Sequence, residues 1–402
     1  MNILFLSDVY FPRINGVSTS IHALRQQLLA QGHQVRLIAP DYYAPSDDES
    51  WIVRVPSHHL FFDPEDRLMR YRRAFARALS LMPTDVDLIH IHTPFAAHYL
   101  GVRLAKWLKV PCVETYHTFF EDYLHHYLPL LPRPVLRFTA RHLSRIQCNA
   151  VDAVVAPSQP MLEALRSYGV NSLAAVIPTG LEAESFVAGD GAAFRRRYGI
   201  DAGREVLLYV GRVAHEKNIG FLLRMLDDLR RFRPGVLLVI AGEGPALEAV
   251  QQETAQLGLL HNVLFIGYLD RATELNDCYA AADIFVFSSL TETQGLVLLE
   301  AMAQGVPVVA VAEMGTKSIL CEGVGAHIAP HDASGFSCKV RNLLADGRQR
   351  IELGALGREY ARQWSAASMT ERMLAFYRQV MTVTESDRRA GDNLGPDPVS
   401  PQ

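Results

Sequence analysis

The sequence predicts an α/β protein made of two domains, each a parallel β-sheet covered by helices. Its 402 residues, 49% of them hydrophobic, are enough to bury two cores of ordinary domain size. Short apolar runs alternate with stretches of helical periodicity through both halves of the chain. This alternation is typical of parallel sheets, because each crossover helix covers a face of the sheet.

The first half contains apolar runs that predict strands and a helix with a clear end. The strands are expected at residues 3–6, 34–39, 88–92, 112–116, 153–156 and 174–177. The helix is expected over residues 19–31, and Gly32 is a typical residue just past a helix C-terminus. The second half repeats the pattern, with strands at 206–210, 236–241, 263–266, 284–287 and 308–311 and helices at 219–232 and 246–257.

Changes in composition predict the domain boundaries. Residues 1–182 form the first domain, and residues 183–204, rich in glycine and charge, form a linker. Residues 205–365 form the second domain, and residues 366–386 contain a last helix, centred on 369–383. Residues 387–402 are rich in Asp, Pro and Gly and are expected to be disordered.

Charge and cysteine content exclude several classes of function. The formal net charge is −4 with acids and bases nearly balanced, which argues against nucleic acid as a partner. The five cysteines are scattered, which favours free thiols in a reducing compartment over disulfides or a zinc site. The apolar N-terminal run stops at Asp8 and is too short for a signal peptide or a spanning helix. We therefore expect a cytoplasmic protein, soluble or peripheral.

Two carboxylates, Glu292 and Glu300, lie eight positions apart across a predicted turn and helix start. Glu292 falls in the loop and Glu300 on the first turns of the helix. The backbone N–H groups of Gly295 and Leu296 at the helix N-terminus favour an anion. Carboxylates accept hydrogen bonds from hydroxyl groups, so the combination suits a ligand that carries both a diphosphate and a sugar.

Further strand-end loops fit the same ligand. Arg212 and Lys217 follow the strand at 206–210, where their charges can neutralise a diphosphate. The loop that contains Gly244 follows the next strand, but Leu247 replaces the third glycine of a dinucleotide motif, which argues against a hydride cofactor. Near the start of the chain, Gly16 allows backbone to approach a ligand closely.

Three histidines lie on or after predicted strands. His90 and His92 alternate and project from one face, and no third ligand is near in sequence, so we expect residues of the core or of a cleft wall and no metal. His117 comes just after the strand at 112–116, at the end where open α/β sheets bind ligands. It is the better candidate for a site residue.

A basic segment without acids extends from Tyr123 to Val151. A spacing of four places its arginines in one row on a helix, with Leu136, Phe138, Leu143 and Ile146 interleaved. The row consists of Arg133, Arg137, Arg141 and Arg145. This pattern is typical of a helix that lies on an anionic membrane, and the alternative is an ordinary charged surface over a core stripe.

Together these strings resemble the motifs of the retaining glycosyltransferases of family 4. Glu292–Glu300 is similar to their E-x7-E signature, the loop from Gly211 to Asn218 to their G-R-x4-K segment, and Thr115–Thr118 to their T-Y-H-T segment. Within the family, the strings Phe11–Ser18, Thr115–Thr118 and Thr291–Gly295 look most like those of bacterial 1,2-diacylglycerol 3-glucosyltransferases. One departure is that Thr293 and Gln294 stand where many members have Gly-Phe.

The resemblance implies the GT-B fold, in which two Rossmann-like domains face a central cleft and the last helix crosses back to the first domain. It implies that Arg212, Lys217 and the backbone at Gly295 and Leu296 hold the diphosphate of the donor, with Gly244 near the nucleotide. Glu300 would bind the ribose and Glu292 the sugar. His117 would contact the donor sugar, and Gly16 would face the donor from the acceptor domain.

The implied reaction is the transfer of a hexose, with retention, from a nucleotide-diphosphate sugar such as UDP-glucose to a lipid, diacylglycerol in the first place. No metal is required if Arg212 and Lys217 neutralise the diphosphate. The enzyme would then work in glycolipid biosynthesis, as a peripheral protein on the inner face of the cytoplasmic membrane. The alternatives are a GDP-mannose-dependent α-mannosyltransferase acting on a lipid or polyprenol, a hexosyltransferase with a soluble acceptor, and a nucleotide-sugar-binding regulator without turnover.

Overall fold

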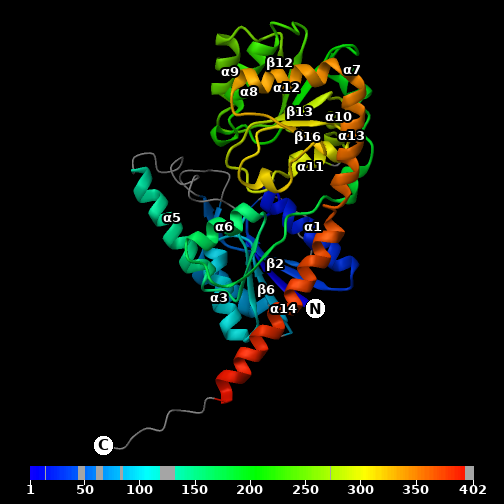
Figure 1. The fold of residues 1–402 in the computed structure, drawn as a ribbon. Coiled ribbons are helices and arrows are strands. Elements are labelled where there is room, and N and C mark those ends of the chain that lie inside the picture. Colours follow the sequence, from blue (N-terminus) through cyan, green and yellow to red (C-terminus); the bar gives the residue numbers. More distant parts are fainter. Residues whose placement is uncertain are drawn as a thin grey trace, which may run out of the picture. The chain divides into compact units, whose positions relative to one another are not determined.

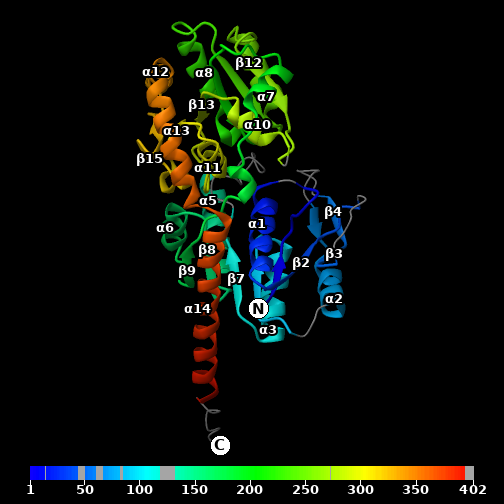
Figure 2. The ribbon, with the colours of Figure 1, turned by 90° about the vertical axis from the view of Figure 1, so that its right-hand side faces the viewer.

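The computed structural model describes residues 1–13, 15–43, 50–59, 67–81, 85–117, 132–271 and 273–393. The chain divides into two compact units. The first unit holds Met1–Pro178 and the chain from Met369 onward, and the second holds Thr179–Ser368. Each unit is built on a parallel sheet with helices on both faces (Figures 1 and 2). The predicted α/β class with two Rossmann-like halves is confirmed.

The first sheet has the strand order β3-β2-β1-β6-β7-β8-β9, and its neighbours pair in parallel. Phe5 of β1 lies between Leu37 of β2 and His90 of β6. The strand bounds are β1 Asn2–Leu6, β2 Gln34–Pro40, β3 Ile52–Val55, β6 Leu88–Ile91, β7 Cys112–Thr115, β8 Ala153–Ala156 and β9 Leu173–Val176. A separate antiparallel pair joins β4 (Ser57–His59) to β5 (Arg67–Met69). Because the chain moves outward from β1 in one direction and then from β6 in the other, the topological switch point lies between these two strands.

The helices of the first unit cover the sheet in two layers. Their bounds are α1 Gly16–Ala30, α2 Tyr71–Leu81, α3 Ala96–Leu108, α5 Arg133–Cys148 and α6 Gln159–Ser167. Asn15 caps α1 by accepting a hydrogen bond from the Ser18 N–H at 2.9 Å, so the helix starts three residues before the predicted position. Gly32 takes a left-handed φ of 79° just past the helix end, as predicted.

The long helix α14 (Ala366–Asn393) packs on the first sheet, beside α1 (Figure 1). Phe376 and Tyr377 share a buried core with Ile21 of α1 and Phe5 of β1. The predicted return of the last helix to the first domain is therefore confirmed. The helix extends to Asn393, seven residues into the tail predicted from residue 387, and the rest of that tail lies outside the described residues.

The second sheet has the order β12-β11-β10-β13-β14-β16-β15, again with parallel neighbours. Its strands are β10 Val206–Val210, β11 Leu237–Ala241, β12 Val263–Gly267, β13 Ile284–Phe287, β14 Val308–Ala310, β15 Cys321–Glu322 and β16 Gly325–Ile328. Its helices are α7 Gly191–Arg197, α8 Ile219–Leu229, α9 Leu247–Gln256, α10 Leu275–Ala280, α11 Leu296–Ala303, α12 Ala333–Ala345 and α13 Gly347–Arg362, with short 3₁₀ turns η1 Ala183–Phe186, η2 His215–Lys217 and η3 Met314–Ser318. The order reverses between β10 and β13, which is the switch point of this unit.

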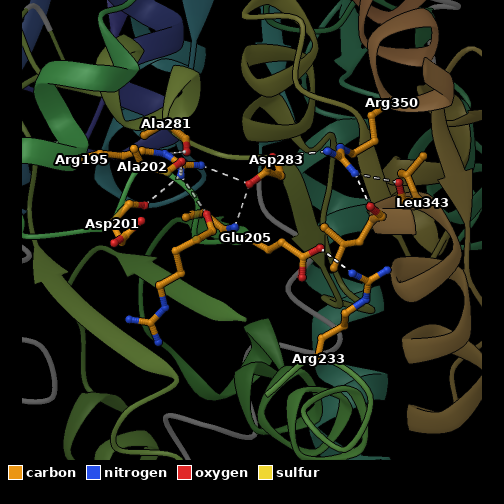
Figure 3. A network of polar contacts seen from close by, with 12 residues as sticks. Arg195, Asp201, Ala202, Glu205, Arg233, Ala281, Asp283, Leu343 and Arg350 are labelled. Atoms are coloured by element: carbon orange, nitrogen blue, oxygen red, sulfur yellow. Dashed lines mark hydrogen bonds and ion pairs between the residues drawn. The ribbon is translucent and has the colours of Figure 1, made fainter. Parts of the chain in front are cut away.

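The segment predicted as a linker, residues 183–204, is an integral part of the second unit. Phe194 of α7 is buried in the core of that unit. Arg195 donates to the Ala281 carbonyl at 2.9 Å and pairs with Asp283 at 3.1 Å, and Asp283 also accepts from the Val206 N–H at 2.9 Å (Figure 3). These contacts fix α7 to the amino ends of β10 and β13. The chain passes between units at Pro178 and Thr179 instead.

Candidate active site

The switch point of the second sheet brings together residues from the loops after β10 and β13. Lys217 ends η2 after β10, and its Nζ lies 2.6 Å from Glu292 Oε2 in the loop after β13. The two side chains are only 21% and 17% exposed. Ser288 Oγ donates to the Asn218 carbonyl at 3.0 Å, which fastens one loop to the other. The two residues predicted for the diphosphate and the sugar are therefore direct neighbours.

The loop after β11 is joined to the loop after β10 by backbone hydrogen bonds. The Val213 N–H donates to the Glu243 carbonyl at 2.8 Å, and the Ala246 N–H donates to the Val213 carbonyl at 3.0 Å. A Cβ on Gly244 would lie 2.4 Å from the Val213 oxygen, and φ is +156° there, so only glycine fits. Gly244 thus has a structural reason to be glycine. Arg212 belongs to this loop pair, and its carbonyl accepts from Tyr209 Oη at 3.1 Å.

Glu300 lies on the second turn of α11 and is 4% exposed. Its Oε2 accepts from Tyr279 Oη at 2.8 Å, and its Oε1 accepts from the Arg271 guanidinium. The charge of Glu300 raises the pKa of Arg271 above its ordinary value, and burial, with the same charge, raises the pKa of Tyr279. Both carboxylate oxygens are thus oriented by partners from α10 and the loop before it. The sequence carries no motif that points to Arg271 or Tyr279, since both are distant from Glu300 along the chain.

In the turn before α11, Gln294, one of the two residues that depart from the family pattern, is hydrogen-bonded to the backbone of Thr179. Gln294 is 6% exposed; its Oε1 accepts from the Thr179 N–H at 2.7 Å, and its Nε2 donates to the Thr179 carbonyl at 2.7 Å. A phenylalanine cannot make these bonds. Gly295 has φ +92° at the N-cap of α11, and the Glu292 carbonyl accepts from the Gly315 N–H at 2.8 Å. The turn that carries Glu292 and leads to Leu296 is therefore held from two sides.

In the first unit, the predicted histidines gather at the carboxyl ends of β6 and β7. His90 and His92 are buried and their rings lie 4.1 Å apart, as expected for residues on one face. His92 Nδ1 lies 3.4 Å from Nε2 of His117, which is partly exposed. Burial lowers the pKa of His90 to about 3 and of His117 to about 4, and lowers that of His92 well below its ordinary value. All three rings are neutral at pH 7.

Asp8 is a buried acid at the switch point of the first sheet that the sequence analysis did not single out. Its carboxylate accepts from Thr93 Oγ1 at 2.8 Å and from the Ala97 N–H at 3.0 Å, at the N-terminus of α3. Burial raises its pKa to about 6. Its position directly after β1 was a usable signal, because polar residues at strand carboxyl ends are candidates for such sites. Gly16, by contrast, is exposed at the start of α1, and among the described residues a Cβ there would meet nothing within 4 Å.

Comparisons with known proteins agree with this arrangement. A model of Glycosyltransferase Family 4 matches residues 14–185, and a model of Glycosyl transferases group 1 matches residues 190–364. An alpha-monoglucosyldiacylglycerol synthase of Streptococcus pneumoniae is 36% identical over 318 residues, which cover 77% of this chain and 71% of that protein. The chain belongs to the family 4 glycosyltransferases.

Two further similarities span almost the whole enzyme. A GDP-mannose-dependent alpha-mannosyltransferase of Mycolicibacterium smegmatis is 28% identical, over 95% of this glycosyltransferase and 98% of that protein. The solved structure of sucrose-phosphate synthase from Thermosynechococcus elongatus is 22% identical with a TM-score of 0.78, over 95% of this chain and 99% of that one. The second similarity shows a shared fold, which confirms the GT-B expectation.

The basic helix of this glycosyltransferase is α5, which carries all four arginines of the predicted row in its backbone. Arg137, Arg141 and Arg145 are exposed, whereas the side chain of Arg133 and residues 118–131 lie outside the described part. Arg141 lies over the Tyr168 ring, 5.5 Å from its centroid. The interleaved apolar residues divide into two groups: Leu136 is buried, but Val135, Phe138, Leu143 and Ile146 are exposed, Phe138 at 71%.

The described residues of the glycosyltransferase hold neither a metal-binding cluster nor a membrane-spanning helix. Within these ranges, no cluster of three or more His, Cys, Asp or Glu side chains is placed to hold a metal ion. Within the same ranges, no helix combines the length and the apolar character needed to cross a membrane.

Proposed function

We propose that this glycosyltransferase moves glucose from a nucleotide-diphosphate sugar to diacylglycerol, with retention at the anomeric carbon. The observation that carries the proposal is the 36% identity to an alpha-monoglucosyldiacylglycerol synthase, whose name states a glucosylated diacylglycerol as product. The site residues of the second unit and the surface of α5 support it independently. The work would take place in the cytoplasm, at the inner face of the membrane.

The donor would be held by the loops at the switch point of the second sheet. Arg212, Lys217 and the backbone at Gly295 and Leu296 would bind its diphosphate, and Glu300 its ribose. Negative charge develops on the diphosphate as it leaves. Two cations and a helix N-terminus would stabilise that charge and so favour departure of the nucleoside diphosphate. A diphosphate oxygen would then take the proton from an acceptor hydroxyl on the same face of the sugar. We expect transfer to continue in EDTA, because Arg212 and Lys217 supply the charge that a metal ion would.

The acceptor would reach the enzyme through a membrane surface at α5. Phe138, Ile146, Leu143 and Val135 expose apolar groups, and three arginines flank them on the same helix. An exposed apolar strip beside a basic row suits an interface where acyl chains meet anionic headgroups. A soluble sugar acceptor would have no use for such a strip.

A donor and acceptor panel tests the proposal. Purified enzyme is incubated with UDP-glucose, UDP-galactose or GDP-mannose, each with diacylglycerol in mixed micelles, and the lipid products are identified by mass spectrometry. The expected result is a monohexosyl diacylglycerol from UDP-glucose at a rate well above the other two donors. Transfer to diacylglycerol from none of them would overturn the proposal.

A second candidate function is the transfer of mannose from GDP-mannose. It is favoured by the similarity to a GDP-mannose-dependent alpha-mannosyltransferase over nearly the full length of both chains. The arginine, lysine and glutamate of the donor site would serve either nucleotide, since diphosphate and ribose are common to both. Preference for GDP-mannose in the same panel, with a lipid or polyprenol acceptor, would establish this alternative.

A further inference from the structure

His90, His92 and His117 of the first unit contact one another in that order, and His90 also contacts Tyr377 of α14. His90 Nδ1 lies 2.6 Å from Tyr377 Oη, and His90 Nε2 lies 2.7 Å from Thr115 Oγ1. Both ring nitrogens are thus engaged by hydroxyls, which can donate or accept as required. His90 is therefore fixed in orientation, and it presents its face to His92.

His92 is held by packing on two sides. The centroid of the His90 ring lies 4.1 Å from that of His92, and the centroid of the Phe5 ring, in an edge-to-face arrangement, lies 4.7 Å from it. One of its nitrogens, Nδ1, faces His117 Nε2 at 3.4 Å. The other nitrogen, Nε2, is buried and has no hydrogen-bond partner among the described residues.

Two neutral imidazoles share one proton in such a contact, so two arrangements compete. If His117 Nε2–H donates, His92 must carry its own proton on Nε2, which leaves a buried N–H without a described acceptor. If His92 Nδ1–H donates, His92 Nε2 carries only a lone pair. An unsatisfied buried N–H is the rarer and more costly defect, so the second arrangement is favoured.

We propose that His92 is a positioning residue that keeps His117 in the tautomer protonated at Nδ1. His117 then offers an N–H donor, and no lone pair, from its second nitrogen. The inference rests on the proposed function and on the contact between His117 and the donor sugar that the family resemblance implies, and it adds the chemistry of that contact. The His117 N–H would donate a hydrogen bond to a hydroxyl or ring oxygen of the hexose, and His117 would not act as a base.

The test is the tautomer itself, measured by two-bond ¹H–¹⁵N correlation on enzyme labelled at histidine. The His117 signals are assigned by their loss in His117→Gln. His98 gives an internal reference for a protonated Nδ1, because its Nδ1 lies 3.0 Å from Glu114 Oε2. The expected result is the Nδ1–H pattern for His117 in the wild type. An Nε2–H pattern there would overturn the inference.

Two substitutions at one position separate hydrogen bonding from packing. His92→Phe keeps a ring between Phe5 and His90 but cannot donate, so His117 should shift to the Nε2–H form that predominates in free histidine. His92→Asn places an amide N–H near the former Nδ1, so the Nδ1–H form should be retained. An unchanged His117 tautomer in His92→Phe would also refute the role of His92.

Kinetics then connect the tautomer to transfer. We expect His92→Phe to lower kcat roughly tenfold, because His117 then loses one net hydrogen bond to the donor sugar. His92→Asn should stay within about threefold of the wild type, because it keeps that bond. Equal losses in both variants would mean a packing role only and would contradict the proposal. Failure of glucosyl transfer in the donor panel would leave the NMR result intact, so the two claims can fail separately.

Discussion

Lys217 Nζ and Glu292 Oε2 lie 2.6 Å apart, so the cation assigned to the donor diphosphate and the carboxylate assigned to the donor sugar bind each other. Both side chains are largely buried, which makes the pair less screened than a surface salt bridge. A diphosphate that binds Lys217 competes with Glu292 for it. Donor binding would therefore release Glu292 to accept from a sugar hydroxyl, and removal of Lys217 alone would leave an unpaired anion beside the diphosphate.

The first prediction follows from that pairing. Lys217→Met should lower kcat/KM roughly 30- to 1,000-fold, because one charge-assisted contact to the leaving diphosphate supplies about 2–4 kcal/mol. The double variant Lys217→Met/Glu292→Gln should bind UDP at least about fivefold more tightly than Lys217→Met, since the uncompensated carboxylate is gone. Calorimetric titration with UDP measures this. The control is Lys339→Met, which breaks an exposed pair with Glu322 and should change neither quantity.

Glu292→Gln and Glu300→Gln should have distinct kinetic signatures. Glu292 is assigned to the sugar next to the reacting carbon, so its loss should mainly lower kcat. Glu300 is assigned to the ribose, so its loss should mainly raise the donor KM. Because Glu300 also pairs with Arg271, its variant should have a lower melting temperature as well. Steady-state kinetics with the donor varied decide the question, and the reverse pattern would show that the two roles are exchanged.

Gly242→Ala should disturb the donor loops through the backbone. A Cβ there would lie 2.0 Å from the Gly211 oxygen, and φ is +141°. Strain of this kind costs about 1–3 kcal/mol, so we expect a lower melting temperature together with weaker UDP binding. Gly199→Ala is the matched control, because Gly199 also has a positive φ but open space around it. Equal effects of the two variants would show that φ alone, and not the contact between the loops, is responsible.

Much of the fold was predictable because buried parallel strands are continuous apolar runs. Runs such as the one that forms β10 (Val206–Val210) need no context to be recognised. Some strands were not predicted because they are short or lie at sheet edges, where side chains are partly polar. These are β3 to β5, β15 and β16. Residues 183–204 resembled a linker because four glycines and seven charged residues interrupt the segment, yet its apolar side chains, Phe194 above all, join the core.

The candidate site was predictable in its positions but not in its contacts. Residues after strands were found because the carboxyl ends of parallel strands meet at one edge. Partners of those residues were not found: Gln294 binds Thr179 and Glu300 binds Arg271 across long separations that no local pattern records. The pairing of Lys217 with Glu292 also depends on the adjacency of β10 and β13, which only the sheet order reveals.

Asp8 should make stability depend on pH in a defined direction. Its pKa is raised from 3.8 to about 6 in the folded protein, so the folded state holds this proton more tightly than the unfolded chain. The free energy of unfolding should therefore fall by about 3 kcal/mol on account of Asp8 as pH rises from about 4 to about 6. Asp8→Asn keeps an acceptor for the Ala97 N–H and removes this loss, so the variant should be more stable than the wild type at pH 7.

The measurement must separate the contribution of Asp8 from that of the histidines, because the two change the free energy of unfolding in opposite directions as pH rises. His90 and His117 have lowered pKa values, so the stability they contribute is present above pH 6.5 and is lost as pH falls. Both proteins keep these histidines, so the difference between Asp8→Asn and wild type, from denaturant unfolding at several pH values, isolates Asp8. A difference that does not change between pH 4 and pH 7 would contradict the assigned pKa.

The last prediction concerns α5 and the membrane. Three arginines near an anionic surface contribute about 1 kcal/mol each, screened over about 8–10 Å at physiological salt. The wild type should float with phosphatidylglycerol vesicles at low salt and be partly released at high salt. The triple change of Arg137, Arg141 and Arg145 to Gln should weaken flotation without changing UDP affinity. Phe138→Ser should weaken the binding that persists at high salt, because this contribution is apolar.

The matched control removes three exposed arginines of the second unit that make only surface ion pairs, and it should float like the wild type. These are Arg231, Arg348 and Arg362, again changed to Gln. Equal loss of flotation in both triple variants would mean that net charge alone governs binding and that α5 has no special part. If the wild type ignores anionic vesicles at low salt, the exposed strip on α5 does not contact lipid, and a soluble acceptor becomes the better explanation of the activity.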